Sequence, residues 1–180
     1  IDTKFAQVGI IKNPETFGGA TIFNENQFSS LFAIKLTSSI SINIGQEITQ
    51  TITSGAGVTT VAKGYVASYD KETNVLKYYQ DRSLCFGNKV DQTDSNDTAA
   101  IVGFSTAATG LSPAGTIDTS FSGSVVTINS KQINLGVNFT NGLADPEINK
   151  KTGDIIYIDN RPTVQRDSRQ KEDVKIILEF

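Results

Sequence analysis

The chain has 180 residues, a formal net charge of -3, 38% hydrophobic residues and 19% charged residues, the balance of an ordinary globular protein. This charge gives no electrostatic reason to expect a nucleic acid or an anionic membrane as partner. His is absent and there is one Cys, so the commonest general base, the commonest zinc ligand and an intrachain disulfide are all excluded.

The N-terminal part predicts two strands separated by a loop. Residues 5–11 form an apolar run that Asn13-Pro14 closes, which is typical of a strand followed by a breaker. Residues 16–24 contain Gly18-Gly19 and are expected to be a loop. In residues 28–37 the apolar side chains are spaced as in a helix in the first half and alternate with others as in a strand in the second half. We expect a strand in the second half, and the first half stays open.

The middle of the chain predicts short antiparallel strands. Residues 40–44 alternate Ile with polar residues until Gly45, and residues 46–53 repeat the alternation. Residues 58–68 and 75–79 are β-rich and are separated by a polar stretch beginning at Asp70, which predicts a hairpin. Strands of this length and spacing favour a small antiparallel barrel or sandwich.

The C-terminal part adds further strands. Residues 125–128 and 133–139 are β-rich, and Asn141-Gly142 predicts a tight turn. Residues 155–158 are apolar on both faces of a strand, which is usual for a strand covered on both sides. Residues 174–180 place apolar side chains on one face and predict a closing strand.

The fold class predicted from these patterns is mainly β. We expect a β-sandwich host domain made from both chain ends, residues 1–37 and 140–180. Residues 38–139 are then an inserted small antiparallel β-barrel or sandwich module. Because the chain starts at Ile1 and contains no Met, we expect it to be part of a longer protein.

No motif predicts a catalytic, cofactor-binding or metal-binding residue, and no cofactor is expected. Asp91, Asp94 and Asp97 lie in DQTDSND, where three carboxylates can surround a cation. The spacing is not that of an EF-hand loop, which needs ligands at alternate positions, a central Gly and a distal Glu. A solvated loop is the simpler interpretation, and cation binding stays open.

Five residues are candidates for protein–protein contacts. The hairpin carries Asp70, Tyr69 and Tyr78, although strand tyrosines often pack across to a neighbouring strand instead. Asn160 and Arg161 lie between two apolar stretches, and Pro162 favours an extended backbone at Arg161. The Arg161 guanidinium can pair with a carboxylate inside the fold or on a partner.

The two ends of the chain carry a family resemblance. GDIIYIDNRP from Gly153 and KIILEF at the C-terminus resemble the end of a baseplate wedge protein of T-even-like contractile-tailed bacteriophages. FAQVGIIKNPE near the start and ADPE at residues 144–147 are similar to the same family. Residues 38–139 have no counterpart in the T-even type.

The resemblance implies a structural virion protein rather than an enzyme. Its location would be the phage tail baseplate after synthesis in the host cytoplasm, and its partners would be other wedge proteins. A homodimer is also implied, whereas no nucleic acid or membrane partner is expected. The alternative is that the inserted module binds a host surface protein or glycan through its tyrosine-bearing strands.

Overall fold

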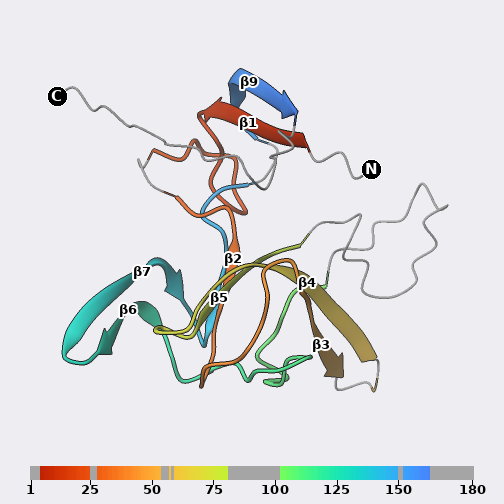
Figure 1. Ribbon diagram of the computed structural model, residues 1–180, viewed down its shortest axis with the longest axis vertical. Helices are drawn as coiled ribbons and strands as arrows, with labels where there is room; N and C mark the ends of the chain where they lie inside the picture. The colour runs from red at the N-terminus through yellow and green to blue at the C-terminus, as the bar shows by residue number, and fades with distance from the viewer. Residues whose placement is uncertain are drawn as a thin grey trace, which may run out of the picture. The chain divides into compact units, whose positions relative to one another are not determined.

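A computed structural model describes residues 5–24, 28–53, 57, 59–80, 102–149 and 152–162, without the side chains of residues 5–8 and 160–162. These residues form nine β-strands and no helix (Figure 1). The mainly β fold predicted from the sequence is therefore confirmed. All strand pairs are antiparallel.

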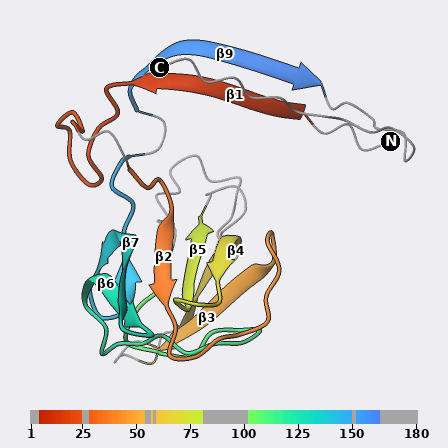
Figure 2. The same ribbon diagram turned by 60° about the vertical axis from the view of Figure 1, so that its left-hand side comes forward.

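The strands belong to three sheets. The largest is a five-stranded antiparallel sheet in the order β3-β4-β5-β2-β8, which curls into a half-barrel (Figure 2). Two further pairs, β6-β7 and β1-β9, each form a two-stranded sheet. In chain order the strands are β1 Phe5–Lys12, β2 Phe32–Lys35, β3 Glu47–Thr53, β4 Thr59–Asp70, β5 Val75–Tyr79, β6 Gly123–Ile128, β7 Lys131–Phe139, β8 Leu143–Ala144 and β9 Asp154–Pro162.

The hairpin predicted around Asp70 is present as β4 and β5. Asp70 pairs with Val75, and a four-residue turn connects them. The ladder then contains a bulge, because Ser68 pairs with Lys77 while Val66 pairs with Tyr78. Ala67 is the extra residue, and it shifts the register of the rest of β4 by one position.

One face of the large sheet is covered by a segment with no strand longer than an isolated bridge, residues 102–117. Because this segment forms no regular ladder, some of its backbone N–H and C=O groups are hydrogen-bonded by side chains instead. The Gln50 amide is 1% exposed; it accepts a hydrogen bond from the Ser105 N–H (2.7 Å) and donates to the Ser105 and Ala108 carbonyls. The core between segment and sheet is formed by Ile34, Leu36, Ile48, Ala62, Val66, Leu76, Tyr78, Phe104, Leu111 and Ile117.

A second glutamine anchors the beginning of the same segment. Gln80 is 7% exposed, and its amide donates to the carbonyls of Lys63 (2.7 Å) and Val102 (2.9 Å). The first bond holds the end of β5 against β4, and the second fixes the segment to both strands. Two buried side-chain amides thus hydrogen-bond to backbone groups of a covering segment that has little regular structure.

The opposite face of the sheet is covered only in part. The β6–β7 hairpin lies at the β2–β8 side of the sheet (Figure 2). Apolar side chains of β7 pack against residues of β2 and β8 there. Toward β3 and β4 this face carries polar and aromatic side chains that are partly exposed. The core of this second cluster consists of Ala33, Val75, Leu135, Val137, Phe139 and Ala144.

The predicted Asn141-Gly142 turn is confirmed and joins β7 to β8. Asn141 and Gly142 both have positive φ, 50° and 79°, the conformation of a tight hairpin turn. The turn also bonds outside itself, because the Lys35 N–H donates to the Gly142 carbonyl and the Gly142 N–H donates to the Phe121 carbonyl. It therefore connects β2, the β8 edge and the chain before β6.

The alternating isoleucines of residues 40–44 form no strand, contrary to the prediction. Ile40 and Ile42 pack against the core, whereas Ile44 is 77% exposed. The Ile40 N–H donates to the Tyr69 hydroxyl (2.9 Å) instead of to a neighbouring strand. A side chain thus satisfies this backbone group, and alternation alone did not predict that.

The chain divides by its internal contacts into two compact units. One contains the β1–β9 ribbon, and the other extends from Pro14 to Thr152. Strands β2 and β8, from the segments assigned to the host domain, pair in one sheet with β3–β5 from the segment assigned to the insert. This shared sheet does not separate a host domain from an insert. The sandwich and the insertion of residues 38–139 therefore stay predictions.

Some predicted features lie outside the described residues. They are the DQTDSND loop with Asp91, Asp94 and Asp97, most of the turn at residues 54–57, and the closing strand at residues 174–180. Apart from residues 40–44, the remaining predicted strands coincide with observed ones. The strand expected at residues 5–11 is β1, and those at 125–128 and 133–139 are β6 and β7.

We predict that Gln50→Leu destabilises the protein by about 3 kcal/mol or more, since it leaves several buried backbone groups of residues 105 and 108 without partners. Urea unfolding monitored by circular dichroism measures the loss. Gln132→Leu, at an exposed position of β7, is the matched control and should change stability by less than about 0.5 kcal/mol. Equal effects of the two variants would show that the Gln50 amide is not needed.

We predict that Gly142→Ala lowers the free energy of unfolding by about 2 kcal/mol or more. The new Cβ would lie 2.5 Å from the Asp118 carbonyl oxygen, and alanine would also be strained at this positive φ. Gly136→Ala separates the two causes. Its φ is +75° but no atom lies within 4 Å of the new Cβ, so only strain of about 1 kcal/mol is expected. Thermal unfolding compares the two, and a smaller loss for Gly142→Ala contradicts the steric argument.

Candidate functional site

Two predicted contact residues, Asp70 and Tyr69, lie together at the end of β4. The Asp70 carboxylate accepts hydrogen bonds from the Glu72 N–H (2.9 Å) and the Thr73 hydroxyl (2.7 Å). These bonds hold the pKa of Asp70 below its ordinary value of 3.8, the Thr73 bond having the larger effect. Tyr69 is half-buried, and its hydroxyl accepts the bond from Ile40.

Tyr78 is a core residue and does not present a surface. It is 3% exposed, its ring stacks on Phe32 (5.4 Å between centroids), and it meets Phe104 edge-on (4.8 Å). Gly64 allows this packing, since a Cβ there would lie 2.7 Å from the Tyr78 ring. Burial raises the pKa of the Tyr78 hydroxyl, and the Asp145 carboxylate adds to the effect.

The other two contact candidates, Asn160 and Arg161, belong to β9. They pair with Gln7 and Ala6 of β1. They therefore lie in a different unit from Asp70 and Tyr69, and the five candidates form no single site within either unit.

The described part of the β1–β9 ribbon is strongly apolar and exposed. Six large apolar side chains on it are each between 47% and 63% exposed. Consecutive strand residues face opposite sides, so residues 155–158 put apolar groups on both faces. The expectation that this strand is covered on both sides is not met within the described residues, where β1 is its only strand partner. The six are Ile10, Ile11, Ile155, Ile156, Tyr157 and Ile158.

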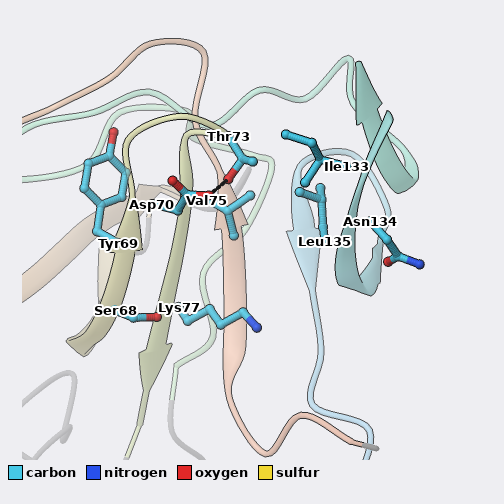
Figure 3. A pocket seen from close by; sticks show the side chains of 9 residues that line it. All are labelled: Ser68, Tyr69, Asp70, Thr73, Val75, Lys77, Ile133, Asn134 and Leu135. Atoms are coloured by element: carbon cyan, nitrogen blue, oxygen red, sulfur yellow. Dashed lines mark hydrogen bonds between the residues drawn. The ribbon is translucent and has the colours of Figure 1, made fainter. Parts of the chain in front are cut away.

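A cleft of about 270 Å³ lies between the β4–β5 hairpin and β7 (Figure 3). On the hairpin side it is lined by Ser68, Asp70 and Lys77, and across from them by Ile133 and Leu135. The Tyr69 and Asn134 side chains also border the cleft but point away from its centre in Figure 3. The cleft thus has a polar side with one carboxylate and one ammonium group, and an apolar side.

The polar side of this cleft continues along the outer face of the sheet. After the bulge at Ala67, the next outward-facing pair is Tyr65 and Tyr79, whose rings stack with centroids 5.8 Å apart. The Tyr65 hydroxyl donates to the Glu47 carboxylate (3.1 Å). The Lys63 ammonium lies 3.5 Å from the same carboxylate. Charged and aromatic groups therefore form one continuous row on this face.

A second cleft of about 470 Å³ is lined by Phe104, Asn138, Thr140, Leu143, Asp145 and Glu147. Glu147 is already engaged, because its carboxylate accepts a bond from the Ser29 N–H (2.7 Å). Within the described ranges, no three His, Cys, Asp or Glu side chains are grouped to hold a metal ion. None of the described segments is a helix long and apolar enough to cross a membrane.

Lys35 is a buried amine that belongs to neither cleft. It is 7% exposed, its ammonium donates to the Leu36 carbonyl (3.2 Å), and it lies 5.6 Å from the Phe121 ring centroid. Burial lowers the pKa of Lys35, and the Asp118 carboxylate partly opposes this shift. Because it lines no cleft described here, we interpret it as part of the packing between β2 and the residues before β6.

Sequence reasoning identified Asp70 and Tyr69 but missed Lys77, Ser68 and the apolar wall from β7. A signal for Lys77 existed. Once the turn after Asp70 is set, pairing across the hairpin places Lys77 opposite Ser68 on the same face as Asp70. Leu135 had no such signal, because β7 lies more than fifty positions further along the chain.

We predict that Asp70→Asn lowers the free energy of unfolding by up to about 1 kcal/mol near neutral pH, where the charged acceptor is lost. Since the folded-state pKa is depressed, this stabilisation is present above pH 3.8 and is lost as the pH falls through the lowered value. Urea unfolding between about pH 7 and about pH 2 should show the two proteins converge.

The matched control for this prediction is Glu72→Gln on the same turn. It removes one negative charge but leaves the Glu72 N–H free to bond Asp70. A stability difference for Asp70→Asn that stays constant with pH, or that Glu72→Gln reproduces, contradicts the assignment.

Comparisons with known proteins give no assignment for this chain. No protein-family model matches it, and no curated protein or solved structure matches it significantly. A function must therefore be inferred from the chain's own residues, their geometry and the resemblance carried by its two ends.

Proposed function

We propose that this chain is a structural, non-enzymatic component of the baseplate wedge of a contractile phage tail. It acts through protein–protein interfaces in the virion, with other wedge proteins and a second copy of itself as partners. The proposal includes a β-sandwich host domain built from residues 1–37 and 140–180, into which residues 38–139 are inserted.

The observation that supports this proposal best is the exposed apolar ribbon of β1 and β9. A two-stranded sheet by itself is marginally stable in water, and contiguous exposed apolar patches mark interaction sites. Burying such side chains contributes about 1.5–3 kcal/mol each. A subunit that is covered by neighbours in an assembly has a physical reason to carry such a ribbon, whereas an isolated protein does not.

The position of the ribbon in the sequence supports the same conclusion. β1 falls within FAQVGIIKNPE and β9 within GDIIYIDNRP, the segments that resemble the wedge family. Two segments separated by more than 140 positions pair along eight residue pairs. Within the described residues, the segments that resemble an assembly protein thus carry exposed apolar side chains.

We predict that Ile156→Asp prevents incorporation of the chain into phage particles, because a charge on the ribbon cannot be buried against a neighbouring subunit without a partner. Particles assembled with the variant are purified, and the chain is quantified by mass spectrometry. Ile44→Asp is the matched control, since Ile44 is 77% exposed but lies in the other unit.

Cryo-electron microscopy of intact particles locates the wild-type chain, and we expect its density in the baseplate. Density elsewhere in the virion, or normal incorporation of Ile156→Asp, contradicts the proposal. Circular dichroism of the purified variant shows whether the unit from Pro14 to Thr152 remains folded. A variant that folds normally but is not incorporated identifies the ribbon as the interface.

A further inference from the structure

The cleft between the β4–β5 hairpin and β7 has the characteristics of a small-ligand site. Small-molecule pockets are about 300–1,000 Å³, mainly apolar, with a few placed polar groups. This cleft, at about 270 Å³, is just below that range and has room for one small ring. Val75, Ile133 and Leu135 form its apolar part.

The polar groups of the cleft include both signs of charge. Asp70 provides a carboxylate, which its lowered pKa keeps ionised at neutral pH. Lys77 provides an ammonium group, and it has no ion-pair partner among the residues that the structure describes. A ligand with a single charge is attracted by one of these two groups and repelled by the other, so its charge brings little net gain. The cleft therefore favours a neutral ligand that both accepts and donates hydrogen bonds.

Neighbouring hydroxyl groups meet this requirement. A hydroxyl donates one hydrogen bond and accepts two. Each Asp70 oxygen retains accepting capacity after its bond from Glu72 or Thr73, and Lys77 donates. A sugar ring also has a C–H face that can pack on Leu135 and Val75. Hydrogen bonds to charged groups are the strongest hydrogen bonds that a neutral ligand can make.

The row of outward-facing residues beyond the cleft extends the site. Lys77 is followed on the same face of β5 by Tyr79, roughly 7 Å further along the strand. The stacked, partly exposed pair of Tyr65 and Tyr79 gives an amphipathic aromatic surface. A ligand ring in the cleft can thus be followed by a second ring over the tyrosines.

We propose that this outer face of the β4–β5 hairpin binds a neutral polyhydroxylated ligand, namely the terminal hexopyranose of a glycan. The terminal ring occupies the cleft between Asp70, Lys77 and Leu135, and the next ring packs on Tyr65 and Tyr79. This site is independent of the β1–β9 ribbon, so it does not depend on the structural role proposed above.

The test is a titration of the isotope-labelled full chain, followed by amide NMR spectra. The probes are D-glucose, D-galactose, D-mannose and N-acetyl-D-glucosamine. We expect saturable shifts at the amides of Ser68, Lys77 and Leu135 with at least one sugar. Leucine, a zwitterion that can also pair with both charges, is titrated as the competing ligand class.

Lys77→Met should weaken binding at least about tenfold, the loss of one hydrogen bond to a charged group. Lys131→Met, at an exposed position of β7, is the matched control and should bind like the wild type. A disaccharide of the best-binding sugar should bind about threefold to tenfold more tightly than the monosaccharide. Tyr79→Leu should remove this gain, so that the disaccharide binds no more tightly than the monosaccharide.

Each outcome of the experiment decides the proposal. No saturable shift at the cleft with any of the four sugars overturns it, as do shifts with leucine alone. Equal weakening by Lys77→Met and Lys131→Met also overturns it. The spectra of the variants themselves show whether they are folded, so loss of binding is not confused with unfolding.

Discussion

The unit from Pro14 to Thr152 depends on hydrogen bonds from two buried glutamines to a covering segment with little regular structure. An apolar face of a sheet must be covered, and a covering loop brings unpaired backbone groups into the core. Gln50 and Gln80 provide the partners for several of these groups. Without them, the packing of Phe104 and Leu111 on the sheet would require burying polar backbone atoms unpaired, which costs about 1–3 kcal/mol for each group.

The two units meet the need to bury apolar surface in different ways. In the larger unit, the segment after Val102 covers one face of the sheet, and the β6–β7 hairpin covers the β2–β8 part of the other face. In the smaller unit, the described ribbon leaves its isoleucines exposed. The larger unit has a core of its own, whereas the described ribbon carries the exposed apolar side chains on which the proposed subunit contacts rest.

The strands were largely predictable, because alternation and turn residues are local signals. Asn141-Gly142 predicted its turn, since both residues tolerate positive φ. Residues 40–44 were mispredicted because Ile40 is bonded by the Tyr69 hydroxyl, a contact across 29 positions that no local pattern contains. Tyr78 was a candidate for contacts, but the space above Gly64 made it a core residue.

The sequence by itself determined a mainly β chain, its hairpin at Asp70, and the apolar character of the strand containing Ile156. Only the tertiary structure decided which residues share a face. Without the bulge at Ala67, strict alternation would put Tyr65 on the face opposite Ser68, and Tyr79 would be paired with Val66. The bulge shifts the register by one residue, so that Tyr65 meets Tyr79 beside Lys77. One extra residue in a strand moves every earlier side chain of that strand to the opposite face of the sheet, because side chains alternate with a period of two.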